Sequence, residues 1–207
     1  MALDSAGDEG VGMVTITCKP GTYTLRTYFE GGHFEMHYMG NSVHDISDPT
    51  APELVAMAWT VNGEAFNARA AFEFNFTDLP AGMPVRSAKL SLYSNHNPIN
   101  GDHTDANYGT TNAFYISRIN ALWSPSTTSW LTQPGIDTDG QVLIPQTNQA
   151  FLDVTDVDVT TMVNKMISSG NYGFKIQLQN ETIYNSRVFY SSAATDSTKH
   201  PKLVVAY

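Results

Sequence analysis

Cysteine is nearly absent from this chain of 207 residues, which contains a single one, Cys18. One cysteine cannot form a disulfide within the chain, so burial of apolar surface has to stabilise the fold. A chain of this length buries roughly 70% of its unfolded surface and needs no covalent cross-link. Cys18 lies on the apolar side of a predicted strand at 13–18, which favours a buried thiol over the alternative, a reactive one.

Charged residues are also scarce, at 15% of the chain against about 25% in typical soluble domains. Eleven Lys and Arg are spread singly among 20 Asp and Glu, which gives a net charge of −9. No basic run is present, and this argues against nucleic acid as a partner because phosphate binding needs clustered cations. The same scarcity of clustered cations argues against polyanionic partners in general, unless a few of these cations converge in the fold.

Long apolar runs are missing as well. No stretch approaches the roughly 20 apolar residues that cross a bilayer, so no membrane span is predicted. The first four residues, Met-Ala-Leu-Asp, lack the basic and apolar regions of a secretory signal. The surface composition, rich in Thr, Ser and Asn, suits an extracellular β-rich module. Two interpretations stay open at this point: a cytoplasmic protein, or a part of a longer secreted or cell-surface one.

Alternating apolar and polar residues dominate the remaining sequence and predict strands, because successive strand side chains point to opposite faces. The C-terminal stretch from 173 to 207 shows this most clearly, and its last strand is expected to bury Leu203, Val205 and Tyr207. Polar loops are predicted at 41–52 and 95–111. The predicted strands span 13–18, 22–29, 33–38, 54–60, 68–76, 88–93, 114–119, 141–144, 150–154, 173–179, 187–191 and 201–207.

One helix is predicted at about 160–168, where apolar residues from Val159 to Ile167 recur at helical spacing. Asp158 or Thr160 is expected to cap its N-terminus. Many short strands, long connections and one helix predict an all-β fold, an antiparallel jelly-roll β-sandwich. We expect residues 1–12 to form a flexible lead-in and residues 13–207 to form a single domain.

Several segments, taken together, resemble the DNRLRE domain of bacterial surface and secreted proteins, also classed as carbohydrate-binding module family 96. They keep the family's order over residues 54–207. The resemblance implies a non-catalytic jelly-roll that is usually appended to glycan-degrading enzymes or large adhesins. It therefore leads us to expect a longer secreted or cell-surface parent protein. The matching segments are the Phe-rich strand and turn at 72–82, the strand at 85–93, the Trp- and Pro-containing stretch at 123–134, the helix at 158–167, and the short pieces at 171–174, 189–192 and 201–203.

Glycan-binding residues are expected among aromatic, His and Asn side chains, since rings stack on sugars and polar groups bond to hydroxyls. The three tryptophans, Trp59, Trp123 and Trp130, are assigned mainly to packing, with sugar stacking as the alternative. The candidate ligand-binding residues are His33, His37, Tyr38, His96, Asn97, His103 and Tyr108.

The loop at 100–107 is rich in oxygen ligands. Asp102, Asp105 and Asn107 lie close in sequence at a predicted turn and could hold a structural calcium, a cation that takes six to eight oxygens. The alternative is a solvated loop without metal. No cofactor is required by the predicted function, so calcium would serve the fold alone.

His33, Glu35 and His37 share one face of a predicted strand, and two His with a carboxylate suit a transition metal. Their spacing of ~7 Å means that a straight strand cannot bring all three to one ion without a bend. His44 and Asp45 could complete such a site. The alternative is a solvated strand face.

Catalytic motifs are absent: the chain has no Gly-x-Ser-x-Gly, no phosphate-binding Gly-rich loop and no His-Glu-x-x-His. Acidic pairs for glycoside cleavage could form in the fold, but nothing in the sequence selects one. The leading hypothesis is therefore a non-catalytic carbohydrate-binding or adhesion module that binds polysaccharide or cell-surface glycan.

Two alternatives stay open. The first is a structural subunit or stalk module of an extracellular fibre, joined to copies of itself or to neighbouring domains by strand addition. The second is an enzyme, either a polysaccharide lyase or a metal-dependent oxidase that uses His33, Glu35 and His37.

Overall fold

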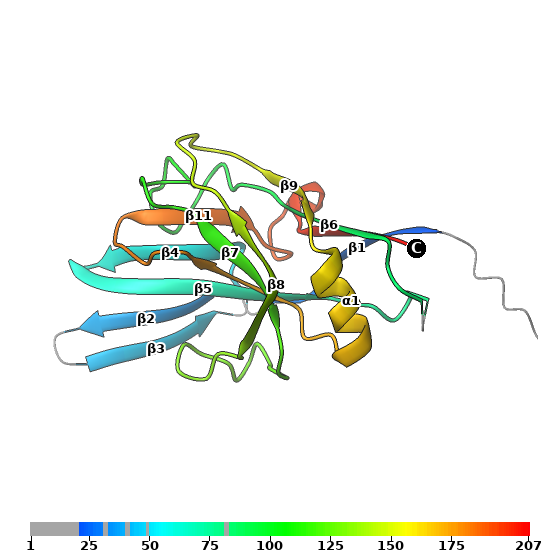
Figure 1. Cartoon of the computed structure of the whole chain (residues 1–207). Coiled ribbons are helices and arrows are strands. Elements are labelled where there is room, and N and C mark those ends of the chain that lie inside the picture. Colours follow the sequence, from blue (N-terminus) through cyan, green and yellow to red (C-terminus); the bar gives the residue numbers. More distant parts are fainter. Residues whose placement is uncertain (1–20, 31–32, 40–41, 49, 81–82) are drawn as a thin grey trace, which may run out of the picture.

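The computed structural model describes residues 21–30, 33–39, 42–48, 50–80 and 83–207, and of residues 25–47 only the backbone. These residues fold as an antiparallel β-sandwich with one α-helix, which confirms the predicted fold class (Figure 1). The elements are β1 (Thr22–Glu30), β2 (His33–Met39), β3 (Ser42–Asp48), β4 (Glu53–Val61), β5 (Glu64–Phe74), β6 (Ser87–Leu92), β7 (Phe114–Ile119), β8 (Ile136–Ile144), β9 (Val154–Asp158), α1 (Thr160–Ser169), β10 (Phe174–Leu178), β11 (Asn185–Tyr190), a 3₁₀ turn (Ser197–Lys199) and β12 (Lys202–Ala206).

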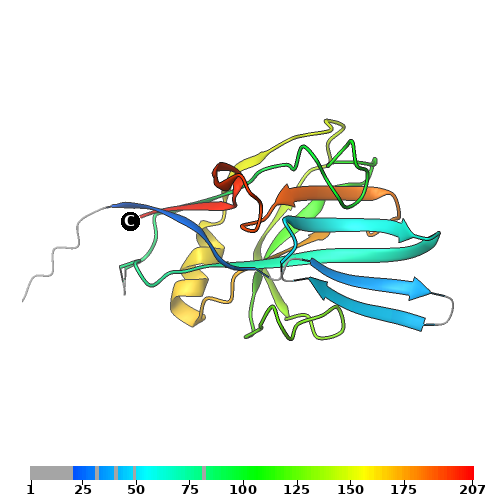
Figure 2. The same cartoon turned by 180° about the vertical axis from the view of Figure 1, so that it is seen from behind.

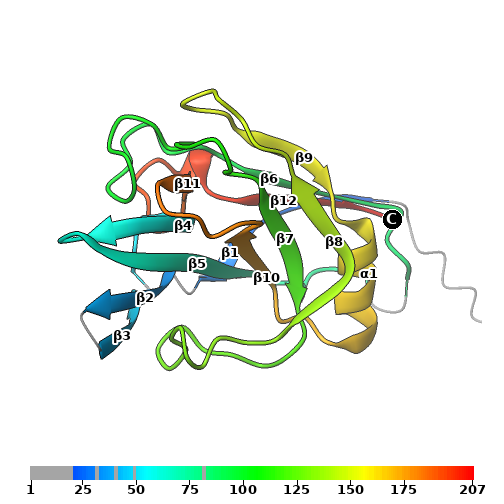
Figure 3. The ribbon, with the colours of Figure 1, turned by 60° about the vertical axis from the view of Figure 1, so that its left-hand side comes forward.

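The long strand β5 joins the two parts of the sandwich. Its first half, to Arg69, pairs with β4 and β2, which are extended by β11 and β3. Its second half, from Ala70, pairs with β10 and β1. A strand that changes partners along its length forms the corner between two packed layers. The path continues from β10 through β7 to β8 and from β1 through β12 to β6 and β9 (Figure 3).

The core lies where the apolar faces of these layers meet. Phe72 and Phe74 of β5 are fully buried and pack edge-on against each other, with ring centroids 6.1 Å apart. Phe174 of β10 closes the cluster at 5.8 Å from the Phe72 ring. Ala70 is also buried and Phe76 partly so, which confirms the predicted inward face of this strand.

The C-terminal strand β12 lies between β1 and β6 (Figure 2). Its alternate residues Leu203 and Val205 are fully buried, and Tyr207 is nearly so, with its ring edge-on to Tyr23. The prediction that the terminus is held in a sheet is therefore confirmed.

The helix α1 is confirmed within one residue of its predicted end. It packs Met162, Val163 and Met166 onto the core beside β8 (Figure 1). The capping prediction is partly wrong, because the N-cap residue is Val159, which has no side-chain cap. Asp158 Oδ1 instead accepts from Thr160 N at 3.0 Å. No helix of the described residues is long and apolar enough to cross a membrane.

Two strands differ from the prediction, and a third lies outside the described residues. Residues 42–48 form β3, although a polar loop was predicted there. The local composition does not favour a strand, but pairing with β2 supplies the backbone hydrogen bonds that stabilise one. β9 begins at Val154, where the predicted strand ends, because Val154 and Val157 face the core beside β6. The predicted strand at 13–18, with Cys18, and the lead-in at 1–12 lie outside the described residues.

Candidate functional site

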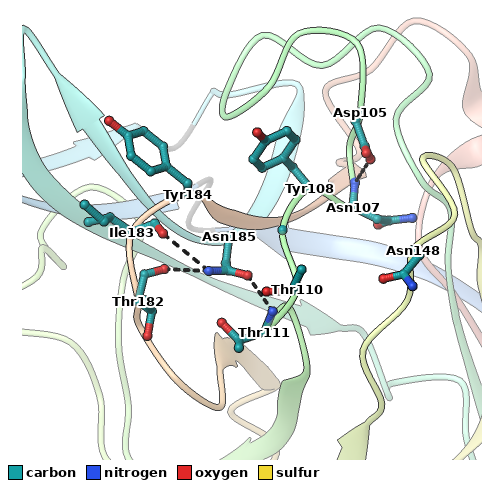
Figure 4. Close-up of a pocket in the computed structure, with 11 residues that line it drawn as sticks. Asp105, Asn107, Tyr108, Thr110, Thr111, Asn148, Thr182, Ile183, Tyr184 and Asn185 are labelled. Carbon is teal, nitrogen blue, oxygen red and sulfur yellow. Dashed lines mark hydrogen bonds between the residues drawn. The ribbon is translucent and has the colours of Figure 1, made fainter.

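The candidate site is a cleft among the described residues, and it lies where two connections meet at one end of the sandwich. Its volume is about 550 Å³. The connection from β6 to β7 provides residues 105–111, the segment that leads into β11 provides residues 182–185, and Asn148 closes one side (Figure 4). Residues about 75 positions apart in sequence therefore form one site.

Two exposed tyrosines lie at this cleft, and both pack against the same tryptophan. Tyr108 is 38% exposed and Tyr184 is 49% exposed. Both rings pack edge-on against Trp59 of β4, each with its centroid 5.2 Å from the tryptophan ring, at interplanar angles of 78° and 88°. Edge-to-face contacts of this kind are favourable and fix ring orientation. The two tyrosines therefore present preset aromatic surfaces to solvent.

Asn185 holds the two walls together. Its Oδ1 accepts from Thr111 N at 2.7 Å, and its Nδ2 donates to the carbonyls of Thr182 at 2.9 Å and Ile183 at 3.4 Å (Figure 4). Gly109 passes so close that an added Cβ would lie 2.2 Å from Asn185 Oδ1. A glycine is needed there both for this approach and for its φ of +93°.

Apart from Gly109 and the apolar Ile183, the other lining residues carry hydroxyls and amides, with a single carboxylate, Asp105. Asn107 is almost fully buried, and its Oδ1 has no hydrogen-bond partner within the described part of the chain. An unpaired buried acceptor is costly unless a water or ligand donor reaches it. Aromatic faces beside amides and hydroxyls can stack on a sugar ring and bond to its hydroxyls.

Comparison with known families decides the class of this domain. The sequence model of carbohydrate-binding module family 96 matches residues 53–207. The chain belongs to this family. No curated protein matches the chain. The match confirms the resemblance seen in the sequence, and it begins at β4, so β1, β2 and β3 of the module precede the matched region.

We call the cleft beside Tyr108 and Tyr184 the aromatic cleft. Of the predicted ligand-binding residues, Tyr108 lines it. His103 is exposed on the same connection but does not line the cleft. His96 and Asn97 lie at its other end, where the His96 ring stacks on Phe151 with centroids 4.7 Å apart. These predictions stay untested; among the predicted residues whose side chains the structure describes, Tyr108 is the one that lines this cleft.

Asn97 lines a second, smaller cleft of about 340 Å³, together with Tyr190. A fully buried carboxylate, Glu53, lies at this cleft and accepts from Asn95 Nδ2 at 2.5 Å, from Ile99 N at 2.8 Å and from Asn100 Nδ2 at 2.9 Å. Burial raises the pKa of the Glu53 carboxyl, and these hydrogen bonds oppose the rise. Because its oxygens are already bonded, Glu53 serves to fix the loop at 95–100.

The proposed transition-metal ligands His33, Glu35 and His37, with Tyr38, fall in β2, and their side chains lie outside the described part of the structure. The backbone register places His37 opposite His44 of β3. The metal site on this hairpin stays a prediction.

For calcium, Asp102 Oδ1 accepts from Thr104 N at 2.8 Å and Asp105 Oδ1 accepts from Asn107 N at 2.9 Å. Both carboxylates thus close local turns. The residues with described side chains contain no group of three or more His, Cys, Asp or Glu that could hold a metal. The calcium site also stays a prediction, and a melting temperature that EDTA leaves unchanged would contradict it.

Sequence reasoning missed Trp59, Tyr184 and Asn185 as site residues. Trp59 was assigned to packing because its neighbours are apolar; it does pack, and the rings it packs against are the exposed tyrosines. Ile183 and Tyr184, two large apolar residues in an otherwise polar connection, were the available signal. That Tyr184 lies beside Tyr108 and Trp59 depends on tertiary structure, and no pattern in the local sequence indicates it.

Proposed function

We propose that this module binds a neutral polysaccharide in the aromatic cleft, without catalysing its cleavage, as part of a secreted or cell-surface protein. The observation that supports this most directly is the pair of exposed tyrosines, Tyr108 and Tyr184, held edge-on by Trp59 beside a cleft of amides and hydroxyls. Membership of a carbohydrate-binding family agrees with a sugar as the ligand.

The charge of the cleft favours a neutral sugar. Its lining residues include one carboxylate, Asp105, and no Lys or Arg. A uronate would bring negative charge towards Asp105 without a cation among the lining residues to balance it, and like charges at close range repel. Hydroxyls of a neutral sugar would find donors and acceptors in Asn148, Thr110 and Thr182.

The same lining argues for binding without cleavage. Glycoside hydrolysis ordinarily needs two carboxyl groups on either side of the scissile bond. Asp105 is the one carboxyl group among the cleft's lining residues. Two other carboxylates, Glu53 and Glu181, do not line the cleft and are engaged in hydrogen bonds with other parts of the fold.

The proposal is tested by affinity gel electrophoresis and calorimetry against neutral polysaccharides (a β-glucan, a xylan, a mannan and an α-glucan) and against polygalacturonate. We expect retention on at least one neutral polymer and none on the uronate. Tyr184→Ala should weaken binding about tenfold, because one stacked ring contributes roughly 1–1.5 kcal/mol. Tyr184→Phe, which keeps the ring, should retain most of the affinity.

Tyr190→Ala is the matched control, since it removes a tyrosine at the second cleft. Its affinity should stay within about twofold of the unmodified protein. Retention on none of the neutral polymers would refute the proposal. If Tyr190→Ala loses affinity and Tyr184→Ala does not, the ligand binds in the second cleft instead.

A further inference from the structure

Tyr184 is carried by an exposed connection. The segment from Gln179 to Tyr184 joins β10 to β11, and all of its side chains are exposed except that of Glu181. Exposed connections of this kind are held by few buried contacts and are the first parts of a fold to open locally. Whether Tyr184 keeps its place beside Trp59 therefore depends on how this segment is anchored.

Gln179, at the start of the segment, donates its backbone N–H to the Ala113 carbonyl at 2.8 Å. Further along, the segment is anchored to β5 by a two-point ion pair between Glu181 and Arg69, to which Asn67 Nδ2 adds a longer hydrogen bond to Glu181 Oε2 at 3.4 Å. Arg69 Nε lies 2.7 Å from Glu181 Oε1, and Arg69 Nη2 lies 2.9 Å from Glu181 Oε2. Both side chains are only 20% exposed. A pair with two parallel hydrogen bonds fixes relative orientation as well as distance, and partial burial reduces its screening by salt.

Arg69 is itself held in place on its other sides. Its guanidinium lies over the ring of Trp130, 4.3 Å from the centroid, and its Nη1 donates to Gln133 Oε1 at 3.1 Å. The fork that receives Glu181 therefore has one preset orientation. At the other end of the connection, Asn185 bonds the carbonyls of Thr182 and Ile183.

We propose that the Arg69–Glu181 pair is a positioning device for the aromatic cleft: it holds residues 179–184 against β5 and so keeps Tyr184 ready for its ligand. The inference rests on the proposed function for the identity of that ligand, a neutral sugar. Neither Arg69 nor Glu181 lines the cleft. Their effect on affinity comes from ordering the connection before binding, which removes an entropic cost of association.

Hydrogen exchange followed by mass spectrometry tests the positioning without any ligand. Glu181→Gln keeps the shape of the side chain and removes its charge. We expect amides of residues 180–184 to exchange about fivefold faster in this variant, while amides of β10 and β11 keep their rates. Asp78→Asn, which removes one negative charge from an exposed turn after β5, should leave both regions unchanged.

Affinity for the neutral polymer retained in the first test gives the second readout. Glu181→Gln should bind about three- to tenfold more weakly at an unchanged melting temperature. Arg69→Gln combined with Glu181→Gln should lose little more affinity than Arg69→Gln alone, because the ion pair is already broken in that single variant. Unchanged exchange at 180–184, or unchanged affinity despite faster exchange, would overturn the proposal.

The two proposals fail separately. If the unmodified protein is retained on none of the polymers, the proposed function fails. The exchange of residues 180–184 in Glu181→Gln then still decides whether the ion pair holds this connection.

Discussion

At the scale of single residues, Lys175 places a positive charge in a buried setting. It lies in β10, is 4% exposed, and its Nζ donates to Gln133 Oε1 at 3.1 Å. Burial lowers its pKa to about 8; the nearby Arg69 adds to this and Glu181 opposes it. At neutral pH the folded protein thus keeps a cation where water cannot solvate it, which costs stability.

We predict that the stability of the protein rises with pH between about 8 and 10 because of this residue. In that interval the unfolded chain, whose lysines have pKa values near 10.4, binds a proton that folded Lys175 has lost. Urea unfolding should show that the free energy of unfolding increases less between pH 7 and pH 9.5 in Lys175→Met than in the unmodified protein. Lys89→Met, at a partly exposed ion pair, is the control, and equal gains in all three proteins would contradict the prediction.

Arg187 of β11 is a second buried cation, with no exposed surface at all. Its guanidinium lies 4.9 Å from the Phe114 ring centroid, and its Nη1 donates to the Pro145 carbonyl at 3.3 Å. Its Nε and Nη2 have no partner within the described residues. Unpaired buried donors are destabilising, so the stacked, apolar part of this side chain contributes more than its charge does.

Arg187→Met is therefore expected to leave the free energy of unfolding unchanged or to raise it by about 1 kcal/mol, because methionine keeps the packing and removes the unpaired donors. Arg187→Ala should lower it by about 2–4 kcal/mol through the cavity that it leaves. Chemical denaturation at pH 7 measures both. If Arg187→Met lowers the free energy of unfolding as much as Arg187→Ala does, the charge itself is stabilising.

Among the elements, the two connections that form the aromatic cleft depend on close contact at Gly109. An added Cβ would lie 2.4 Å from the Tyr184 carbonyl as well as against Asn185. Gly63, in the turn between β4 and β5, also has a positive φ, of +85°, but an added Cβ there meets nothing within 4 Å. The two glycines share a backbone conformation and differ in their surroundings.

Gly109→Ala is predicted to destabilise the protein by more than about 2 kcal/mol and to weaken glycan binding, because the clash separates the two cleft walls. Gly63→Ala should cost only the roughly 1 kcal/mol of a left-handed alanine and leave binding intact. Thermal melts and calorimetry on both variants check this. Equal effects of the two substitutions would show that the contact at Gly109 is relaxed without cost.

For the whole molecule, β1 is part of the sheet interior, although the family match begins only at residue 53. Thr22 to Arg26 pair with β12, and Thr27 to Glu30 pair with β5. Removing β1 would leave backbone groups of both neighbours without partners at an opened seam.

We therefore predict that a fragment of residues 53–207 is much less stable than the full chain and aggregates, whereas a fragment beginning at Gly21 keeps β1 and its pairing. Thermal unfolding and light scattering distinguish the two. A fragment 53–207 that melts cooperatively at the temperature of the full chain would show that the matched region folds by itself.

Much of the fold could be predicted from local pattern. Alternation in β5 predicted the inward Phe72 and Phe74, and helical spacing predicted the buried Met162 and Val163 of α1. Such patterns are readable because burial of one face constrains every second residue of a strand, or every third and fourth residue of a helix. β3 was missed because pairing with a neighbouring strand, rather than its own composition, makes it a strand.

The sequence by itself determined most strands of the described region, though not β3, together with the helix, the faces that they bury and the family to which the chain belongs. Tertiary structure alone decided that Tyr108, Tyr184 and Trp59 meet, that Glu181 reaches Arg69 and that β1 separates β5 from β12. The physical reason is that burial of one face of a strand or helix leaves a repeating pattern in the local sequence. The backbone hydrogen bonds that join strands use groups that nearly every residue type has, so they carry little sequence information. Which strand ends lie together, and hence which loops form the cleft, follows from packing of the whole sandwich.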